Sequence, residues 1–189
     1  LRWVSDGVER VDSYLFNPHK WLLTNFDCST LWVRNRAALT ETLSIVPEYL
    51  RTAQSEAGEV VDFRDWQVPL GRRFRALKLF FVMRHYGLEG LRDHIRTGIA
   101  DATWLEEAIV AHPALELVAP RSLALVCFAH VDGDDATGRL LEAIADDPRY
   151  LCTRTVAAGR VSVRVAVGSP RTTRATIEQF WAFLVAAAA

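Results

Sequence analysis

The sequence predicts an α/β fold whose C-terminal part forms a small α+β unit. Two observations predict that unit: valine alternates with more polar residues from Val161 to Val167, as in a half-buried strand, and a helical pattern follows over 173–185. A third observation concerns the N-terminal half, where two short stretches of strand-forming residues flank a turn sequence that contains Pro18.

The N-terminal half is expected to contain short elements and one long connection. In chain order these are the tail of a helix over 1–10 that ends near Gly7, strands over 13–16 and 28–33, and a helix over 36–44. Residues 45–68 are polar and follow neither the helical nor the strand period. A connection of this length inside a compact domain is typical of a lid, a binding loop or a disordered segment.

Two consecutive helices are expected next. Apolar residues recur at helical spacing from Gly71 to Tyr86 and again from Leu88 to Ile109, and Gly87 between them is a residue type that commonly ends a helix. The remaining elements are a strand over 123–130, a helix over 137–145, strands over 151–156 and 161–167 with a turn at 157–159, and a helix over 173–185. This succession indicates an α+β domain with one sheet face covered, whose boundary is expected between 111 and 123.

The composition argues against several classes of partner. Charged residues make up 24% of the chain and the net charge is -1, so neither nucleic acid nor an anionic membrane surface is an expected partner. The longest apolar runs are shorter than the roughly 20 residues that a membrane-spanning helix needs. Three scattered cysteines, Cys28, Cys127 and Cys152, form no CxxC pair and favour a reducing compartment, so a cytoplasmic location is expected. Because the chain opens at Leu1 and its only methionine is Met83, an N-terminal portion is expected to be missing.

The stretch LFNPHKWLL, over 15–23, places a lysine between His19 and Trp21 in the connection between the two predicted strands. A lysine is rarely buried among bulky side chains unless its amine has a partner or a chemical role. A lysine that forms a Schiff base needs such a partly desolvated site. Asn17 offers a neutral hydrogen-bond donor suited to a phosphate oxygen, and Pro18 fixes the turn.

Three segments carry a resemblance to a known family: DSYLFNPHKWLLTNFDCSTLWV, the PEYL that follows it, and DFRDWQVPLGRRFRALKLFFVMRHYG. They resemble the group II pyridoxal-phosphate-dependent decarboxylases, whose best-known member is aromatic-L-amino-acid decarboxylase. The resemblance covers essentially the whole chain. It implies a fold-type I (aspartate-aminotransferase-like) enzyme, with the C-terminal part of the large domain over 1–115, a catalytic loop at about 45–68, and the small α+β domain over 116–189.

The resemblance also implies roles for individual residues. Lys20 matches the lysine that holds pyridoxal 5′-phosphate as a Schiff base, and Asn17 matches a ligand of the cofactor phosphate. His19 lines the same pocket. Tyr49 matches a tyrosine that reaches the neighbouring subunit's site in a homodimer. The residues that match the substrate pocket are Phe26, Leu70 and Gly71, the last two in the pocket of the partner subunit.

The implied reaction is the decarboxylation of an L-amino acid to its amine and carbon dioxide. The substrate's amine would displace Lys20, the carboxylate would leave, and Tyr49 would return a proton to Cα, since a tyrosine hydroxyl keeps its proton at neutral pH. Aromatic substrates are favoured because Phe26, Leu70, Gly71 and Tyr49 follow the aromatic pattern, and Gly71 leaves room for a bulky ring.

Several alternatives stay open. His19 can be a packing residue behind the pocket, and Phe26 can be a core residue. The substrate can be histidine, glutamate or diaminobutyrate, and the chain can belong to an aldehyde synthase, although phenylalanine at the position of Tyr49 accompanies that activity in related plant and insect enzymes. A non-catalytic interaction module is disfavoured by the intact Lys20 and Asn17. The histidines lack a metal-binding spacing such as HExxH, so no metal is expected.

Overall fold

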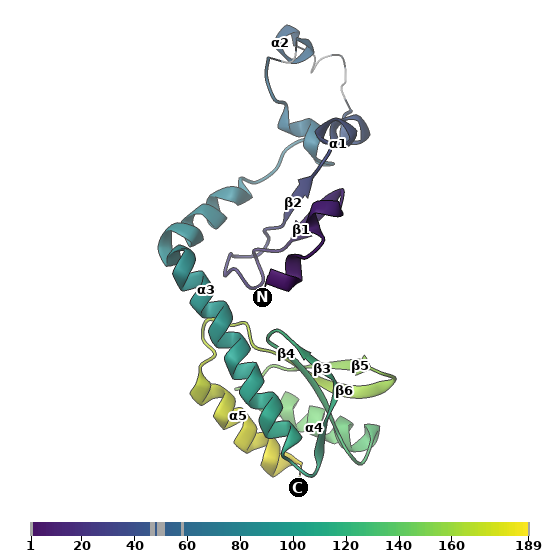
Figure 1. Ribbon diagram of the computed structural model, residues 1–189, viewed down its shortest axis with the longest axis vertical. Helices are drawn as coiled ribbons and strands as arrows, with labels where there is room; N and C mark the ends of the chain where they lie inside the picture. The colour runs from purple at the N-terminus through teal and green to yellow at the C-terminus, as the bar shows by residue number, and fades with distance from the viewer. Residues whose placement is uncertain (1, 46–47, 49–51, 58, 189) are drawn as a thin grey trace. The chain divides into compact units, whose positions relative to one another are not determined.

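The structure of the protein is a computed structural model that describes residues 2–45, 48, 52–57 and 59–188 (Figure 1). The predicted proton donor Tyr49 lies outside these residues. The chain divides into two compact units, Leu1–Val82 and Met83–Ala189. The fold is mixed α/β, as the sequence predicts. The predicted boundary between a large and a small domain at residue 115 stays a prediction.

A two-stranded antiparallel sheet organises the first unit. Strands β1 (Ser13–Phe16) and β2 (Thr30–Val33) pair in register, from Ser13 opposite Val33 to Phe16 opposite Thr30. The ring of Phe16 stacks on Trp32 with centroids 5.4 Å apart, which fixes the two strands side by side. The connection between β1 and β2 contains residues 17–24, the lysine turn, which carries Lys20.

The N-terminal segment differs from the expectation. The predicted helix tail over 1–10 is wrong, because the described residues there form two 3₁₀ turns, Arg2–Ser5 and Val8–Arg10. Gly7 lies between them in the left-handed region, with φ of 86°. That conformation interrupts a continuous α-helix and is readily adopted by glycine. The apolar residues in this stretch therefore do not mark one helical face.

The long polar connection over 45–68 is not structureless. Its described part contains a short helix, α2 (Ala53–Glu56), and a 3₁₀ turn, η4 (Phe63–Trp66). The turn η4 packs on helix α1 (Arg36–Leu43), where the guanidinium of Arg36 lies 5.2 Å from the centroid of the Trp66 ring. The C-terminal end of this connection is therefore held against α1.

The longest helix is α3 (Arg75–Val110), which begins at Arg75 rather than at Gly71. Gly87 has φ of 65° and ψ of 175°, so two helical stretches meet at a kink there, as the sequence predicts. Essentially only glycine adopts this backbone conformation without strain.

The second unit is built on a four-stranded antiparallel sheet in the order β3-β4-β6-β5. The strands are β3 (Leu115–Ser122), β4 (Leu125–His130), β5 (Thr153–Ala157) and β6 (Arg160–Ala166). Helix α4 (Asp134–Asp146) packs on β4 and β6 and contacts α5 (Arg174–Ala187) (Figure 1). The predicted α+β unit is therefore present, with the additional strand β3 at one edge.

The hydrophobic core of the second unit lies between the sheet and the helices. Its fully buried side chains come from α3, β4, α4, β6 and α5: Leu105, Ile109, Val126, Phe128, Leu140, Ile144, Val163 and Leu184. Thr173 caps α5, and its side chain and that of Thr176 each bind the other's backbone amide. Among the described residues, no helix combines the length and the apolar character needed to cross a bilayer.

Candidate active site

The lysine turn follows directly after β1. The amide of Lys20 donates to the carbonyl oxygen of Asn17 at 3.0 Å, and the amide of Thr24 donates to the carbonyl oxygen of Pro18 at 3.2 Å. Pro18 is buried, which anchors the turn in the first unit. The Lys20 side chain is exposed, so the described residues do not provide the partly desolvated site that the sequence analysis expects for Lys20. Its amine makes no hydrogen bond or ion pair with the residues that the structure describes. The turn therefore presents the Lys20 amine to a ligand.

Asn17 faces Ser29 across the start of the connection. The Ser29 hydroxyl donates to Oδ1 of Asn17 over 2.5 Å. These two residues continue the pairing of β1 and β2, in which Phe16 lies opposite Thr30. The amide nitrogen Nδ2 of Asn17 has no partner among the described residues and keeps both of its N–H donors.

His19 is held by the backbone of Cys28. Its Nδ1 lies 2.7 Å from the carbonyl oxygen and 3.0 Å from the amide nitrogen of Cys28, and the His19 amide donates to the same carbonyl oxygen at 3.2 Å. Phe26 meets the imidazole edge-on, with ring centroids 4.9 Å apart. Nε2 of His19 has no described partner, so it is the ring nitrogen available to a ligand.

The segment that carries Phe26 is tied to the first turn of α3. Asp27 forms an ion pair with Arg75 at 2.9 Å, and Lys78 donates to the carbonyl oxygen of Asn25 at 2.9 Å. The hydrogen bond from Arg75 lowers the pKa of Asp27 from its ordinary 3.8 to about 2. These contacts hold Phe26, whose ring is 83% exposed, at a fixed position in the connection.

The other two predicted substrate-pocket residues lie before α3. Leu70 is 63% exposed, and Gly71 lines a groove of about 550 Å³ together with Trp66, Pro69 and Arg73. A Cβ added at Gly71 would meet no atom within 4 Å. The structure therefore brings Asn17, His19, Lys20 and Phe26 together in one connection. It places Gly71 at a groove of the same unit, and Leu70 precedes Gly71 in the chain but does not line that groove. No side-chain contact in the described residues joins the two groups.

Ser29 and the backbone of Cys28 are the site features that the sequence analysis did not identify. Both act across the strand pair rather than along the chain. The spacing could have indicated Ser29, because position 17 directly follows the first strand and position 29 directly precedes the second. The predicted second strand began too early, at Cys28, which concealed that pairing.

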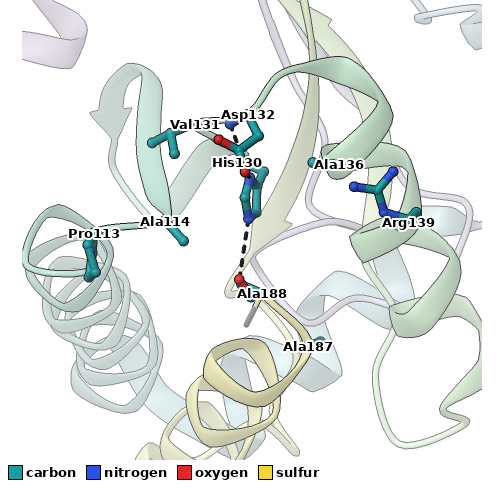
Figure 2. A pocket seen from close by; sticks show the side chains of 9 residues that line it. All are labelled: Pro113, Ala114, His130, Val131, Asp132, Ala136, Arg139, Ala187 and Ala188. Carbon is teal, nitrogen blue, oxygen red and sulfur yellow. Dashed lines mark hydrogen bonds and ion pairs between the residues drawn. The ribbon is translucent and has the colours of Figure 1, made fainter.

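A second pocket lies in the second unit and contains none of the predicted site residues. Figure 2 shows His130 between the ends of β4 and α5. The pocket that it lines has a volume of about 480 Å³. Nδ1 of His130 accepts from the amide of Asp132 at 3.1 Å, so the other nitrogen, Nε2, is the donor to the carbonyl oxygen of Ala188 at 3.3 Å. Both ring nitrogens therefore have a partner, and Nε2 ties the end of α5 to His130. Within the described residues, no three His, Cys, Asp or Glu side chains cluster as metal ligands would.

The fold defines the class of protein. The chain superposes on the crystal structure of Oryza sativa TDC with PLP and tryptamine with a TM-score of 0.92 and 40% identity, over 97% of this chain and 40% of that chain. This is the α/β architecture of the fold-type I pyridoxal-phosphate-dependent enzymes, and the predicted fold class is confirmed. Residues 1–131 match the pyridoxal-dependent decarboxylase conserved domain, and the chain belongs to that family.

Individual relatives include both decarboxylases and aldehyde synthases. The chain is 45% identical to tyrosine decarboxylase 2 of Narcissus pseudonarcissus over 93% of its length. It is 43% identical to phenylacetaldehyde synthase of Arabidopsis thaliana over the same share. In both comparisons the chain spans 37% of the length of the relative.

Proposed function

We propose that the intact protein decarboxylates an aromatic L-amino acid to its amine and carbon dioxide with bound pyridoxal 5′-phosphate. The observation that carries the proposal is the turn after β1, which contains both the Lys20 amine, without a described partner, and the amide donors of Asn17, and whose backbone joins the two residues. An aldehyde reacts with a primary amine, and a phosphate accepts amide hydrogen bonds. The donor set of this turn therefore fits the cofactor named by the family.

Each residue of the turn has a distinct task in this proposal. Lys20 holds the cofactor covalently, Asn17 donates to its phosphate, and His19 presents Nε2 to the pocket. When bound, pyridoxal 5′-phosphate supplies an electron-withdrawing ring that accepts the electron pair left as carbon dioxide departs. Tyr49 then delivers a proton to Cα of the substrate, because its hydroxyl is protonated at neutral pH.

The aromatic substrate class rests on the pocket residues and on the relatives. Phe26 offers a ring face beside His19, and Gly71 has open space where a larger residue would project. Relatives at 38–45% identity are named as tyrosine, tryptophan and aromatic-L-amino-acid decarboxylases. These names favour an aromatic ring over histidine, glutamate or diaminobutyrate as the substrate side chain.

Aldehyde synthesis is the second candidate, because a phenylacetaldehyde synthase is nearly as similar as the decarboxylases. The two activities differ in the fate of the carbanion, which is either protonated at Cα or oxidised by dioxygen. The tyrosine at position 49 favours protonation and hence the amine.

We also propose that the protein works as a cytoplasmic homodimer. Leu77, Phe80 and Phe81 on α3 are 42%, 54% and 60% exposed, and an apolar surface of this kind supports an assembly. Tyr49, Leu70 and Gly71 would then act in the partner's site. Cys28, Cys127 and Cys152 are all free thiols, which supports a reducing compartment.

The test of the proposal is the identity of the lysine that binds the cofactor. The intact holoprotein is reduced with borohydride, digested and mapped by mass spectrometry, and the pyridoxyl adduct is expected on Lys20. Lys78 is the other lysine of the chain, and its amine already donates to Asn25. An adduct on Lys78, or no adduct within this chain, contradicts the assignment.

A further inference from the structure

Ser29 and Asn17 are brought together by strand register. Each step forward along β1 is matched by one step back along β2, from Ser13 opposite Val33 to Phe16 opposite Thr30. Asn17 and Ser29 are the next pair in that series. Directly opposed side chains of an antiparallel pair lie within hydrogen-bonding reach, so the Ser29 hydroxyl meets the Asn17 amide although twelve positions separate them in sequence.

The distance between the two side chains indicates which end of the amide faces Ser29. Ser29 Oγ lies 2.5 Å from the amide atom assigned as Oδ1 of Asn17. Hydrogen bonds between two oxygens span about 2.5–3.0 Å, whereas those from a nitrogen to an oxygen span about 2.7–3.2 Å. The short distance therefore fits a hydroxyl that donates to the carbonyl oxygen and not an NH₂ group that donates to the hydroxyl. A serine hydroxyl can donate or accept, so the orientation of the amide is indicated here by the short distance between the two side chains.

The orientation of the amide decides how Asn17 meets an anion. With Oδ1 turned to Ser29, the two N–H donors of Nδ2 are left for a ligand. With the amide reversed, the lone pairs of Oδ1 would face the phosphate oxygens and repel them. The donation from the Ser29 hydroxyl to Oδ1 therefore holds the amide in the orientation that can bind an anion.

We infer that Ser29 is a positioning residue for the cofactor phosphate, which acts by fixing the side-chain amide of Asn17 with its N–H donors toward the ligand. The inference rests on the proposed function, because it requires Asn17 to be a phosphate ligand. It adds a residue that does not itself contact the cofactor. Ser29 is exposed and directly precedes β2, so its role does not depend on core packing.

The test compares two ligands that differ only in the phosphate. The apo form of the intact protein is titrated with pyridoxal 5′-phosphate and with pyridoxal, and binding is followed by quenching of tryptophan fluorescence. Ser29→Ala is expected to weaken pyridoxal 5′-phosphate binding about three- to ten-fold, the effect of one net hydrogen bond. Its affinity for pyridoxal is expected to stay at the wild-type level. Ser29→Thr keeps a hydroxyl and is expected to restore the phosphate preference.

Thr30→Val is the matched control. The Thr30 hydroxyl donates to the carbonyl oxygen of Phe16 at 3.3 Å, so this variant removes a neighbouring hydroxyl between the same two strands without touching Asn17. Its ratio of affinities for the two ligands is expected to equal that of the wild type. The double variant Asn17→Ala/Ser29→Ala is expected to bind no more weakly than Asn17→Ala alone, because Ser29 then has no amide to orient.

The possible results separate the inference from the proposed function. If Asn17→Ala weakens both ligands equally or neither, Asn17 is not a phosphate ligand, and the inference fails together with the role proposed for Asn17, while the proposed function is decided separately by the adduct on Lys20. If Asn17→Ala lowers the affinity for pyridoxal 5′-phosphate alone but Ser29→Ala changes nothing or weakens both ligands equally, the proposed function stands and the role of Ser29 is overturned. A Ser29→Ala effect that persists undiminished in the Asn17→Ala background overturns it as well.

Discussion

At position 49, a single hydroxyl group separates the two outcomes of the proposed reaction. Tyr49→Phe keeps the ring and removes only the proposed proton donor. Carbon dioxide should still form, because its loss does not need that proton, while amine formed per carbon dioxide should fall roughly 10²-fold. The missing amine should be replaced by aldehyde, ammonia and hydrogen peroxide, with dioxygen consumed. The measurement is carbon dioxide, amine and peroxide in the same assay.

Tyr86→Phe is the control for that substitution, since Tyr86 lies on α3 outside the proposed site. It should leave the ratio of amine to carbon dioxide at the wild-type value. A Tyr49→Phe variant that does the same would show that the proton comes from another group.

The ion pair between Asp27 and Arg75 makes the free energy of unfolding depend on pH, and the direction of that dependence can be predicted. The pKa of Asp27 is lowered to about 2 in the folded chain, below its ordinary 3.8, so the pair stabilises the fold above the ordinary value. That contribution is lost as the pH falls from 3.8 toward 2. Asp27→Asn should therefore lower the free energy of unfolding at pH 7, and the difference from the wild type should shrink in that acidic window.

Urea unfolding of the intact protein at pH 7 and at successive pH values down to about 3 measures this difference. Asp6→Asn is the control, because the carboxylate of Asp6 has no partner among the described residues. A wild-type-minus-variant difference that is independent of pH for Asp27→Asn would show that its charge is not what stabilises the segment.

Residues along one turn could be predicted from the sequence, but their partners across the sheet could not. Asn17, His19 and Lys20 stand within four positions, so a motif reveals them together. Ser29 and Cys28 reach them only through the pairing of β1 with β2, which depends on where each strand begins. The ion pair of Asp27 with Arg75 joins still more distant positions and has no local signal.

Among the elements, α3 offers a pair of glycines with opposite expected behaviour. Gly87 has φ of 65°, where a Cβ is strained although no atom lies within 4 Å. Gly87→Ala should lower the free energy of unfolding by about 1–3 kcal/mol. Gly90 stands in the helical part, and a Cβ there would lie at an ordinary 3.5 Å from Cβ of Tyr86. Gly90→Ala should raise the free energy of unfolding by roughly 0.5–1 kcal/mol.

Urea unfolding of the two variants side by side tests the kink directly. The expected result is that Gly87→Ala lowers the free energy of unfolding and Gly90→Ala raises it. Equal destabilisation by both would mean that Gly90 is constrained as well, and a neutral Gly87→Ala would mean that α3 is straight.

Element β3 shows why one strand could not be predicted. Its sequence LELVAPRS does not alternate cleanly, because the register with β4 shifts between Leu117 and Ala119 and again between Ala119 and Ser122. Each such irregularity breaks the two-residue period on which strand prediction depends. Pro120 lacks an amide donor and is accepted because β3 is an edge strand. By contrast β6 is central and regularly paired, and its valine alternation made it predictable.

At the scale of the whole molecule, the homodimer proposal predicts complementation between two variants that each form little or no amine. Lys20→Ala removes the cofactor lysine and Tyr49→Phe removes the donor proposed to act in the partner's site. Mixed and allowed to exchange, the two variants form hybrids with one site that has both groups. Random exchange makes about half of the dimers hybrid, so amine formation should recover to about a quarter of the wild-type rate.

The assay needs proof of exchange, for example by native mass spectrometry of differently tagged chains. With exchange shown, absence of any recovered amine formation means that Tyr49 acts within its own chain. Mixing either variant with itself is the control and should give no recovery.

The pairing of β1 with β2 also determines what natural selection can change in the turn between them. Asn17 and Ser29 stand at the two ends of the connection, so insertions or deletions over 18–28 leave them facing each other as long as the strands pair. A substitution that removes the amide at position 17 also removes the reason for a hydroxyl at position 29. The two positions should therefore drift together among descendants of this chain, even where the loop between them varies freely in length.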